Sequence, residues 1–223
     1  MISKESFIIS DTHWGHKNVL KYEPIRLEIS NQHGYGSDVD TLMIDKWNEN
    51  ISEEDTILHL GDLFFKNKES QFELDTLNSL NGNKLLLVGN HDRPKYYNKL
   101  DDKWFIIDNI IIDDFSENFN DLRNNLSKKF ELSQKEKRLL VCFITTINNK
   151  RILFSHFPLF NNNPYDKKYN KITDALEYLY NKYNCDLNIH GHTHSYNSIF
   201  ENSINVSVEN QNLTPIKIKE LLK

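Results

Sequence analysis

Five short, largely apolar runs in this 223-residue chain are each followed closely by a residue that can bind a metal ion. Runs of this length are typical of buried β-strands and are too short to span a membrane. Residues that follow neighbouring strands meet at one edge of a sheet, so we expect the five segments to build a single site. The runs occupy residues 7–9, 56–60, 84–88, 152–154 and 187–190, and the residues that follow them are Asp11, Asp62, Asn90, His156 and His192.

Helical patterns lie between these runs and indicate the fold class. The clearest begins at Ser37, which makes a capping-box-like start with Asp40 ahead of a periodic apolar stretch. Two further helices are predicted at residues 70–80 and 172–183. The alternation of strands and helices predicts an α/β protein.

The segment 113–150 departs from this alternation. Its first part, residues 117–137, is polar and has a helical pattern. An apolar run at 139–147 then reaches Asn148 and Asn149, which predict the turn of a β-hairpin. We expect one domain over the whole chain, in which this segment is an insertion whose helical part can overhang the site; a solvated surface helix is the alternative.

The end of the chain is expected to complete the sheets. Residues 196–200 and 204–208 are predicted to be closing strands, and residues 215–222 a terminal element.

Composition excludes several classes of protein. With 38% hydrophobic residues, a chain of this length can bury roughly 70% of its unfolded surface in one core. The net charge of −5 argues against a protein that binds duplex nucleic acid mainly by neutralising phosphates. The first ten residues lack the apolar core of a signal peptide, and no segment is long enough to cross a membrane. Cys142 and Cys185 lie in or beside apolar runs and are expected to be buried thiols, which favours a cytoplasmic location.

The residue types at the strand ends suit a pair of metal ions. Carboxylate and imidazole donors bind manganese, iron or zinc, and a carboxylate placed between two ions can bridge them. Asp62 is the candidate bridge, and Asn90 offers a neutral amide oxygen that adds no negative charge near an anionic substrate. Two such ions lower the pKa of a shared water and hold the oxygens of a phosphate group, which predicts a hydrolytic site.

Two pairs of candidate ligands are separated by a single residue. Asp11 and His13 can reach the same ion only if the chain bends, and Gly15 permits that bend. His192 and His194 point to the same face if the backbone is extended, so each can serve a different ion.

The residues that follow Asn90 are candidates for acid catalysis. His91 is free to protonate a leaving oxygen if Asn90 is the ligand. Asp92 can accept a hydrogen bond from His91 and raise its pKa; a spectator role for His91 is the alternative. His16 and Arg93 are candidate contacts for a substrate phosphate, with a surface position and a surface salt bridge as the respective alternatives.

Taken in order, the blocks Asp-Thr-His, Gly-Asp, Gly-Asn-His-Asp, His and Gly-His-Thr-His resemble the signature of the calcineurin-like metallophosphoesterase superfamily. The similarity extends from Asp11 to His194, and residues 10–18 resemble small single-domain bacterial and phage members. The resemblance implies two packed mixed β-sheets flanked by helices, in four layers. It further implies that His91 is the catalytic histidine. The implied ligands of one ion are Asp11, His13, Asp62 and His194, and those of the other are Asp62, Asn90, His156 and His192.

The sequence thus predicts a metal-dependent phosphoesterase that uses a hydroxide shared by two divalent transition-metal ions, chosen among manganese, iron, zinc, nickel and cobalt. Phosphodiesters, among them nucleotide substrates, are the favoured substrates. A phosphomonoesterase or protein phosphatase with the same core is the nearest alternative. A metal-binding scaffold without activity is the alternative from another class.

Overall fold

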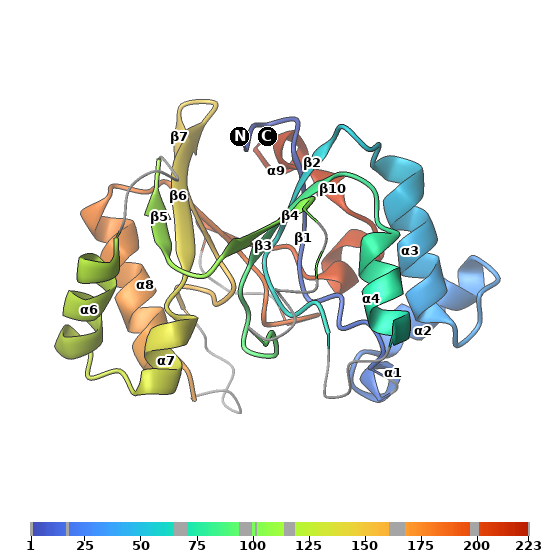
Figure 1. Ribbon diagram of the computed structural model, residues 1–223, viewed down its shortest axis with the longest axis horizontal. Helices are drawn as coiled ribbons and strands as arrows, with labels where there is room; N and C mark the ends of the chain where they lie inside the picture. Colours follow the sequence, from blue (N-terminus) through green and yellow to red (C-terminus); the bar gives the residue numbers. More distant parts are fainter. Residues whose placement is uncertain are drawn as a thin grey trace.

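The computed structural model describes residues 2–16, 18–64, 71–93, 100, 102–113, 119–160, 168–196 and 201–222, with residues 71–74 described by their backbone. In this part of the chain two five-stranded sheets pack face to face, and helices cover their outer faces (Figure 1). The α/β class and the helix–sheet–sheet–helix layering predicted from the sequence are confirmed.

The first sheet contains four parallel strands and one antiparallel edge strand. Its order is β10 (Ile216–Lys217), β1 (Phe7–Ile9), β2 (Thr56–His59), β3 (Asn83–Leu87) and β4 (Trp104–Ile107). Strands β1 to β4 run parallel, and β10 pairs antiparallel with β1. The outer face carries α1 (Val19–Tyr22), α2 (Pro24–Gln32), α3 (Val39–Asn50) and α4 (Gln71–Asn78) on the right in Figure 1.

The second sheet is mixed. Its order is β5 (Ile110–Ile112), β6 (Cys142–Ile147), β7 (Lys150–Ser155), β8 (Leu187–His190) and β9 (Ser203–Asn205). Only the β6–β7 pair is antiparallel among these strands. Its outer face carries α6 (Asn120–Lys129), α7 (Gln134–Leu139) and α8 (Asn170–Lys182) on the left in Figure 1. A 3₁₀ turn (Val208–Gln211) and α9 (Ile218–Leu221) complete the described elements.

Alternating side chains along the strands build separate cores. In β2, Ile57 faces the helices of the first sheet and Leu58 faces the second sheet. In β7, Leu153 packs under α8, whereas Ile152 and Phe154 join the core between the sheets. This period-two pattern is the reason that both sheets are covered on each face.

Several local details differ from the sequence predictions. Helix α3 is capped by Asp38, whose Oδ1 accepts from the backbone N–H of Thr41 at 3.3 Å, and not by Ser37. The stretch expected to be helical at 117–137 contains two helices, and the second is started by a capping box between Ser133 and Glu136. Helices α1 and α2 and strands β4 and β5 were not predicted from the sequence.

Other predictions near the chain's end have mixed outcomes. The Asn148–Asn149 turn is confirmed, since both residues adopt the positive φ angles that a tight hairpin requires, 50° and 61°. Strand β9 lies close to the run predicted at 204–208. Of the strand predicted at 196–200, Tyr196 lies in a loop and the rest falls outside the described residues. Among the helices described, none is long and apolar enough to cross a membrane.

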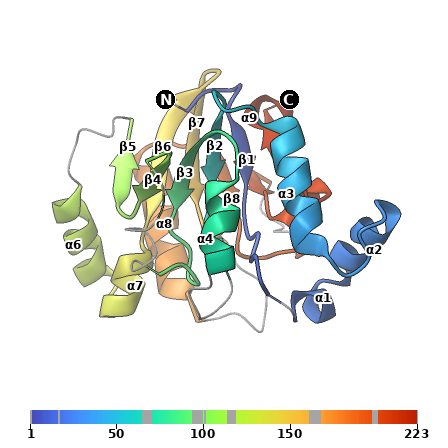
Figure 2. The ribbon, with the colours of Figure 1, turned by 45° about the vertical axis from the view of Figure 1, so that its right-hand side comes forward.

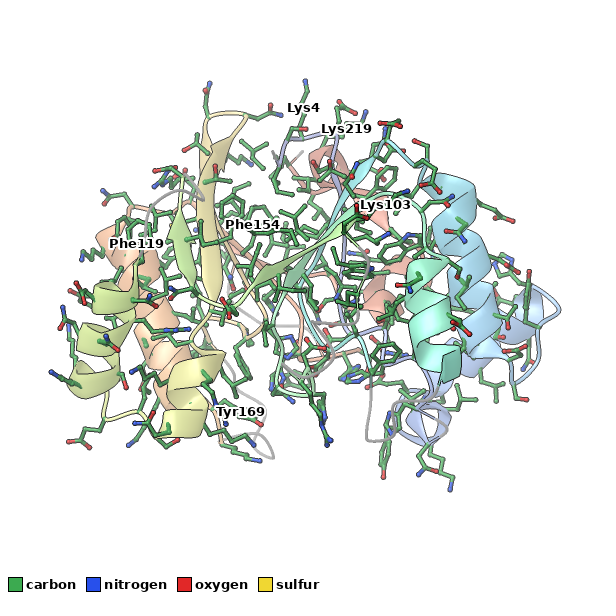
Figure 3. All side chains as sticks on the ribbon, in the orientation of Figure 1. Lys4, Lys103, Phe119, Phe154, Tyr169 and Lys219 are labelled. Carbon is green, nitrogen blue, oxygen red and sulfur yellow. The ribbon has the colours of Figure 1, made fainter. Side chains whose placement is uncertain are left out.

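Replacing Phe154 by alanine is expected to destabilise the fold by about 3–5 kcal/mol, because its ring is fully buried between the sheets and stacks on Phe143 with centroids 6.0 Å apart. Figure 3 shows Phe154 in this interior position. The measurement is urea unfolding. Phe105→Ala is the matched control, since the Phe105 side chain is 51% exposed, and it should lower the free energy of unfolding by about 1 kcal/mol or less. Equal losses in the two variants would contradict this assignment of the core.

Candidate metal centre

The predicted metal-binding residues converge at the ends of strands from both sheets. Asp11 follows β1, Asp62 follows β2 and Asn90 follows β3, while His156 follows β7 and His192 follows β8. The four innermost side chains, those of Asp11, His13, Asp62 and His156, are at most 3% exposed. The structure thus brings residues that are up to 183 positions apart in sequence, Asp11 and His194, to one location.

Five of the seven candidate ligands have backbone conformations that non-glycine residues rarely adopt. The φ angles are 59° at Asp11, 49° at His13, 59° at Asp62, 70° at His192 and 49° at His194. Such angles cost of order 1–3 kcal/mol each and cluster where function requires them. Gly15 also adopts a positive φ, 75°, so the chain bends there as expected and, in addition, at Asp11 and His13 themselves. The extended backbone considered for His192 and His194 is not found.

One cluster of donors contains Asp11, His13 and His194. Asp11 Oδ1 lies 3.8 Å from His13 Nε2, and the rings of His13 and His194 stack with centroids 5.1 Å apart. Asp11 Oδ2 accepts from Ser207 Oγ and from the backbone N–H of His192. Its Oδ1 is buried and accepts no hydrogen bond from the described residues, so a cation in this cluster would satisfy it.

The second cluster contains Asp62, His156 and Asn90. His156 Nε2 lies 3.5 Å from Asp62 Oδ2 and 3.0 Å from Asn90 Oδ1. The opposite ring nitrogen, Nδ1, donates to the carbonyl of Leu60 at 2.8 Å, which turns the Nε2 lone pair toward these oxygens when the ring is neutral. The ring of His192 lies 5.1 Å from that of His156.

Asp62 connects the two clusters. Its Oδ2 lies 3.6 Å from His13 Nε2 in the first cluster and 3.5 Å from His156 Nε2 in the second. The nearby imidazoles hold the pKa of Asp62 well below its ordinary value against the opposing effect of burial. The donor atoms of Asp11, His13 and His194 lie within 4.8 Å of one another, as do those of Asp11, Asp62 and His156. These carboxylate and imidazole sets fit divalent metal ions.

The close approach of the ligand loops at this point depends on glycine. A Cβ atom on Gly191 would overlap Ser10 Oγ and Asp11 Oδ2. A Cβ atom on Gly61, where φ is 101°, would lie 2.6 Å from the backbone nitrogen of Gly89. Any side chain at these positions would push the ligand loops apart.

Two residues that sequence reasoning missed lie directly behind the ligands. His194 Nδ1 donates to Glu209 Oε1 at 3.0 Å, which directs Nε2 of the same ring toward Asp11 and His13. Arg26, which is fully buried, donates to Glu209 and to the backbone carbonyls of Asp11 and Thr12 at 2.7 and 2.8 Å. Burial alone would raise the pKa of Glu209, but Arg26 and His194 hold it below its ordinary value.

The sequence does carry a signal for Glu209. Glu209 closely follows the apolar run predicted at 204–208, in the same relation to a strand as the other site residues. Arg26 is one of only five arginines in a chain rich in lysine, but nothing in its local pattern indicates burial. Glu23 offers a further carboxylate near His194 and Glu209. Glu209 Oε1 accepts from both Arg26 and His194, which positions the His194 ring, while Glu209 Oε2 is buried and accepts no hydrogen bond from the described residues.

The expected hydrogen bond between His91 and Asp92 is not formed. The Asp92 carboxylate accepts instead from the backbone N–H groups of Asp62, Leu63 and Gly89, at 2.8, 3.0 and 2.8 Å. Asp92 therefore fixes the loop that carries Asp62. Burial, with a smaller effect of Asp62, raises the pKa of Asp92 to about 6.

His91 lies over the first cluster. Its ring centroid is 5.3 Å from that of His13, and its backbone N–H donates to Asp62 Oδ1 at 2.7 Å. Burial lowers the pKa of His91 despite the neighbouring Asp62 carboxylate, so the expectation of a raised pKa was wrong.

Two cavities border the metal-binding residues and share no lining residue. The first, about 340 Å³, is lined by four histidines together with residues in and after α1: His13, His16, His91, His194, Val19, Tyr22 and Glu23. The second, about 430 Å³, is lined by Asn90, Asp92 and Arg93. The structure thus places His16 and Arg93 at different cavities on the border of the same centre.

The two strand histidines are not candidate ligands. His59 is fully buried, accepts from the backbone N–H of Gly61 and contacts Thr12 Oγ1 at 3.1 Å; burial lowers its pKa to about 3. His190 is also buried and donates to the carbonyl of Gly191 at 2.8 Å. Their burial and contacts make both of them core residues.

Comparison with known proteins identifies the family. Residues 7–196 match the calcineurin-like phosphoesterase family. A solved structure of a protein of unknown function from Aquifex aeolicus, AQ665, shares 25% identity over 97% of this chain and 96% of its own, with a TM-score of 0.65. A novel archaeal phosphodiesterase shares 18% identity over 90% of this chain and 81% of its own, with a TM-score of 0.38.

A curated relative, the protein MJ1445 of Methanocaldococcus jannaschii, is 30% identical over 93 residues, which is 42% of this chain. The matched part spans about half of that relative, 49% of its length. Members of the matched family generally bind divalent metal ions, which agrees with the two clusters of donors. With most of its length matched, from residue 7 to residue 196, the chain belongs to the calcineurin-like phosphoesterase family.

Proposed function

We propose that the protein is a phosphodiesterase that acts on nucleotides or other small phosphodiesters with two divalent transition-metal ions. The observation that carries this proposal is the position of Asp62, whose Oδ2 lies at nearly equal distances from His13 Nε2 and His156 Nε2. One ion is held by Asp11, His13, Asp62 and His194. The other is held by Asp62, Asn90, His156 and His192.

The chemistry of the donors is consistent with manganese, iron, zinc, nickel or cobalt. Two such ions supply a water of lowered pKa and a clamp for the phosphate oxygens. The chain supplies the orientation: Leu60 fixes the His156 ring, Glu209 fixes the His194 ring, and Asp92 fixes the loop that carries Asp62.

His91 is the residue proposed to protonate the leaving oxygen. It borders the cavity that contains His16 and Tyr22, whose rings stack with centroids 6.3 Å apart. The Tyr22 side chain is 72% exposed, and an exposed aromatic ring beside the centre gives a nucleoside base a surface on which to stack. This cavity favours a nucleotide leaving group over a phosphoprotein.

Hydrolysis of bis-p-nitrophenyl phosphate and of p-nitrophenyl phosphate by the metal-loaded protein tests the proposal. The diester is expected to have the higher kcat/KM. Preference for the monoester would instead favour the phosphomonoesterase alternative. Turnover of neither compound with any of the five metals would contradict the proposed activity.

Replacing His91 by alanine is expected to lower kcat for the diester by about 10²–10⁴-fold, because proton transfer to the leaving group is lost. Bound metal, measured by elemental analysis, should remain at the wild-type level, since His91 is not among the proposed ligands. His33→Ala is the matched control, because His33 is exposed at the end of α2. Unchanged turnover in His91→Ala would exclude the acid role.

We also propose a cytoplasmic location. Its support is that Cys142 and Cys185 are both buried free thiols, as is usual in a reducing compartment.

A further inference from the structure

A cavity beside the metal centre carries an excess of positive charge. This basic cavity, about 430 Å³ in volume, is bordered by four cationic side chains and two carboxylates. Its lining residues are Val88, Asn90, Asp92, Arg93, Asp108, Arg123, Lys135, Arg138 and Leu139. The chain as a whole carries a net charge of −5, so the positive charge of this cavity is opposite in sign to the net charge of the protein.

The basic cavity is continuous with the metal centre. Asn90, which lines it, has its Oδ1 only 3.0 Å from His156 Nε2. Helix α7 ends just before β6, whose first residue, Cys142, pairs with Ser155, the residue before His156 (Figure 2). A ligand that binds the metal centre therefore lies beside α7.

The cations come from separate elements and face the same space. Lys135 and Arg138 are three residues apart on α7, a spacing that places them on one side of the helix. Arg123 comes from α6 and is oriented by a hydrogen bond from its Nη1 to the carbonyl of Asp108 at 2.6 Å. The Arg123 Nε is buried and has no acceptor among the described residues.

The two carboxylates do not cancel this charge. Both oxygens of Asp92 accept hydrogen bonds from backbone N–H groups, and these donors compensate the negative charge of the carboxylate. Asp108 is exposed to solvent, as are Lys135 and Arg138, so screening weakens these charges alike, and the four lining cations still outnumber the two carboxylates. Because the Debye length in physiological salt is about 8 Å, an anion in the cavity responds mainly to the lining cations and much less to the distant acidic surface.

We propose that the basic cavity binds a second phosphate group of the substrate, covalently linked to the ester that is cleaved at the metal centre. This inference rests on the proposed phosphodiesterase function and narrows its substrate class to phosphodiesters that carry an additional phosphate. The segment 113–150, expected from the sequence to overhang the site, supplies three of the four cations: Arg123, Lys135 and Arg138. It thereby determines specificity.

The test compares two chromogenic diesters that differ by one phosphate, thymidine 5′-(p-nitrophenyl phosphate) and its 3′-phosphorylated form. In the metal-loaded wild-type protein, the 3′-phosphorylated diester is expected to have a kcat/KM about tenfold higher, because charged hydrogen bonds to the second phosphate are gained. In the Lys135→Met/Arg138→Met double variant this ratio should fall to about one. The double variant Lys128→Met/Lys137→Met removes the same charge from positions outside the cavity lining and should keep the wild-type ratio. A wild-type ratio of one, or a ratio that survives in Lys135→Met/Arg138→Met, overturns the proposal.

A binding measurement separates this proposal from the function on which it rests. Inorganic pyrophosphate is titrated calorimetrically into the metal-free full-length chain, and its Kd is expected to rise about tenfold in Lys135→Met/Arg138→Met. If Lys135→Met/Arg138→Met loses pyrophosphate binding while the wild-type protein hydrolyses neither diester, the phosphodiesterase function is contradicted and the cavity is supported as an anion-binding site. If wild type and Lys135→Met/Arg138→Met bind pyrophosphate with equal Kd, the proposal that the cavity binds phosphate is overturned, whatever the hydrolytic activity. Variant-sensitive pyrophosphate binding without a kinetic preference would show that the cavity takes a free anion, and would overturn its role in substrate binding.

Discussion

Replacing Asp62 by asparagine is expected to reduce diester hydrolysis by about a thousandfold or more, because a shared ligand contributes several kcal/mol of charge stabilisation through both ions. Asparagine keeps the size of the side chain and the acceptor for the His91 backbone N–H, but removes the charge between His13 and His156. Metal content should fall for both ions at once. Kinetics and elemental analysis of the purified variant measure the two effects.

Thermal unfolding provides a second measurement of metal binding by Asp62→Asn. Metal ions that bind the folded state raise the Tm of the wild-type protein, and this rise should be small in Asp62→Asn. Asp174→Asn, an exposed substitution on α8 that makes the same chemical change, should match the wild type in activity, metal content and Tm. If Asp62→Asn retained two ions and most of its activity, Asp62 could not be the shared ligand.

Replacing Arg26 by methionine is expected to lower the free energy of unfolding by about 3–5 kcal/mol, because it leaves a buried carboxylate without its partner. Arg26 and Glu209 are both almost inaccessible to solvent, and their ion pair has an Nη2–Oε1 distance of 2.5 Å. The substitution also removes the donors to the carbonyls of Asp11 and Thr12, which hold the first ligand loop in place. Urea unfolding measures the loss.

Two controls show whether the loss comes from the unpaired charge. Adding Glu209→Gln to Arg26→Met removes the uncompensated carboxylate and should restore part of the stability. Lys103→Met breaks an exposed ion pair with Glu53 and should reduce stability by about 1 kcal/mol or less. A loss in Arg26→Met no larger than that in Lys103→Met would contradict a structural role for the buried pair.

The strands that carry the site were predictable because their signals are local. The apolar runs that became β1, β2, β3, β7 and β8 are short and continuous, as expected of strands covered on both faces. The predicted ligands all lie at the ends of these strands, where residues far apart in sequence must meet. Their assignment to individual ions and the single-domain organisation with an insertion at 113–150 stay predictions.

What the sequence did not reveal depends on contacts between distant segments. The positive φ angles at Asp11 and Asp62 are imposed by the packing of loops from both sheets, which no local pattern encodes. Asp92 binds backbone N–H groups of another loop instead of the adjacent His91, a choice that only the folded chain determines. Arg26 and Glu209 are 183 residues apart, so their pairing could not be inferred from spacing.

Two metal ions that share Asp62 are proposed to perform phosphodiester hydrolysis. The most direct test titrates Mn²⁺ into metal-stripped protein while the hydrolysis of bis-p-nitrophenyl phosphate is followed. We expect the rate to rise with added metal and to reach its maximum near two ions per chain, the number that a site with a shared carboxylate holds. A maximum at one ion per chain, or no hydrolysis with manganese, iron, zinc, nickel or cobalt, would contradict this proposal.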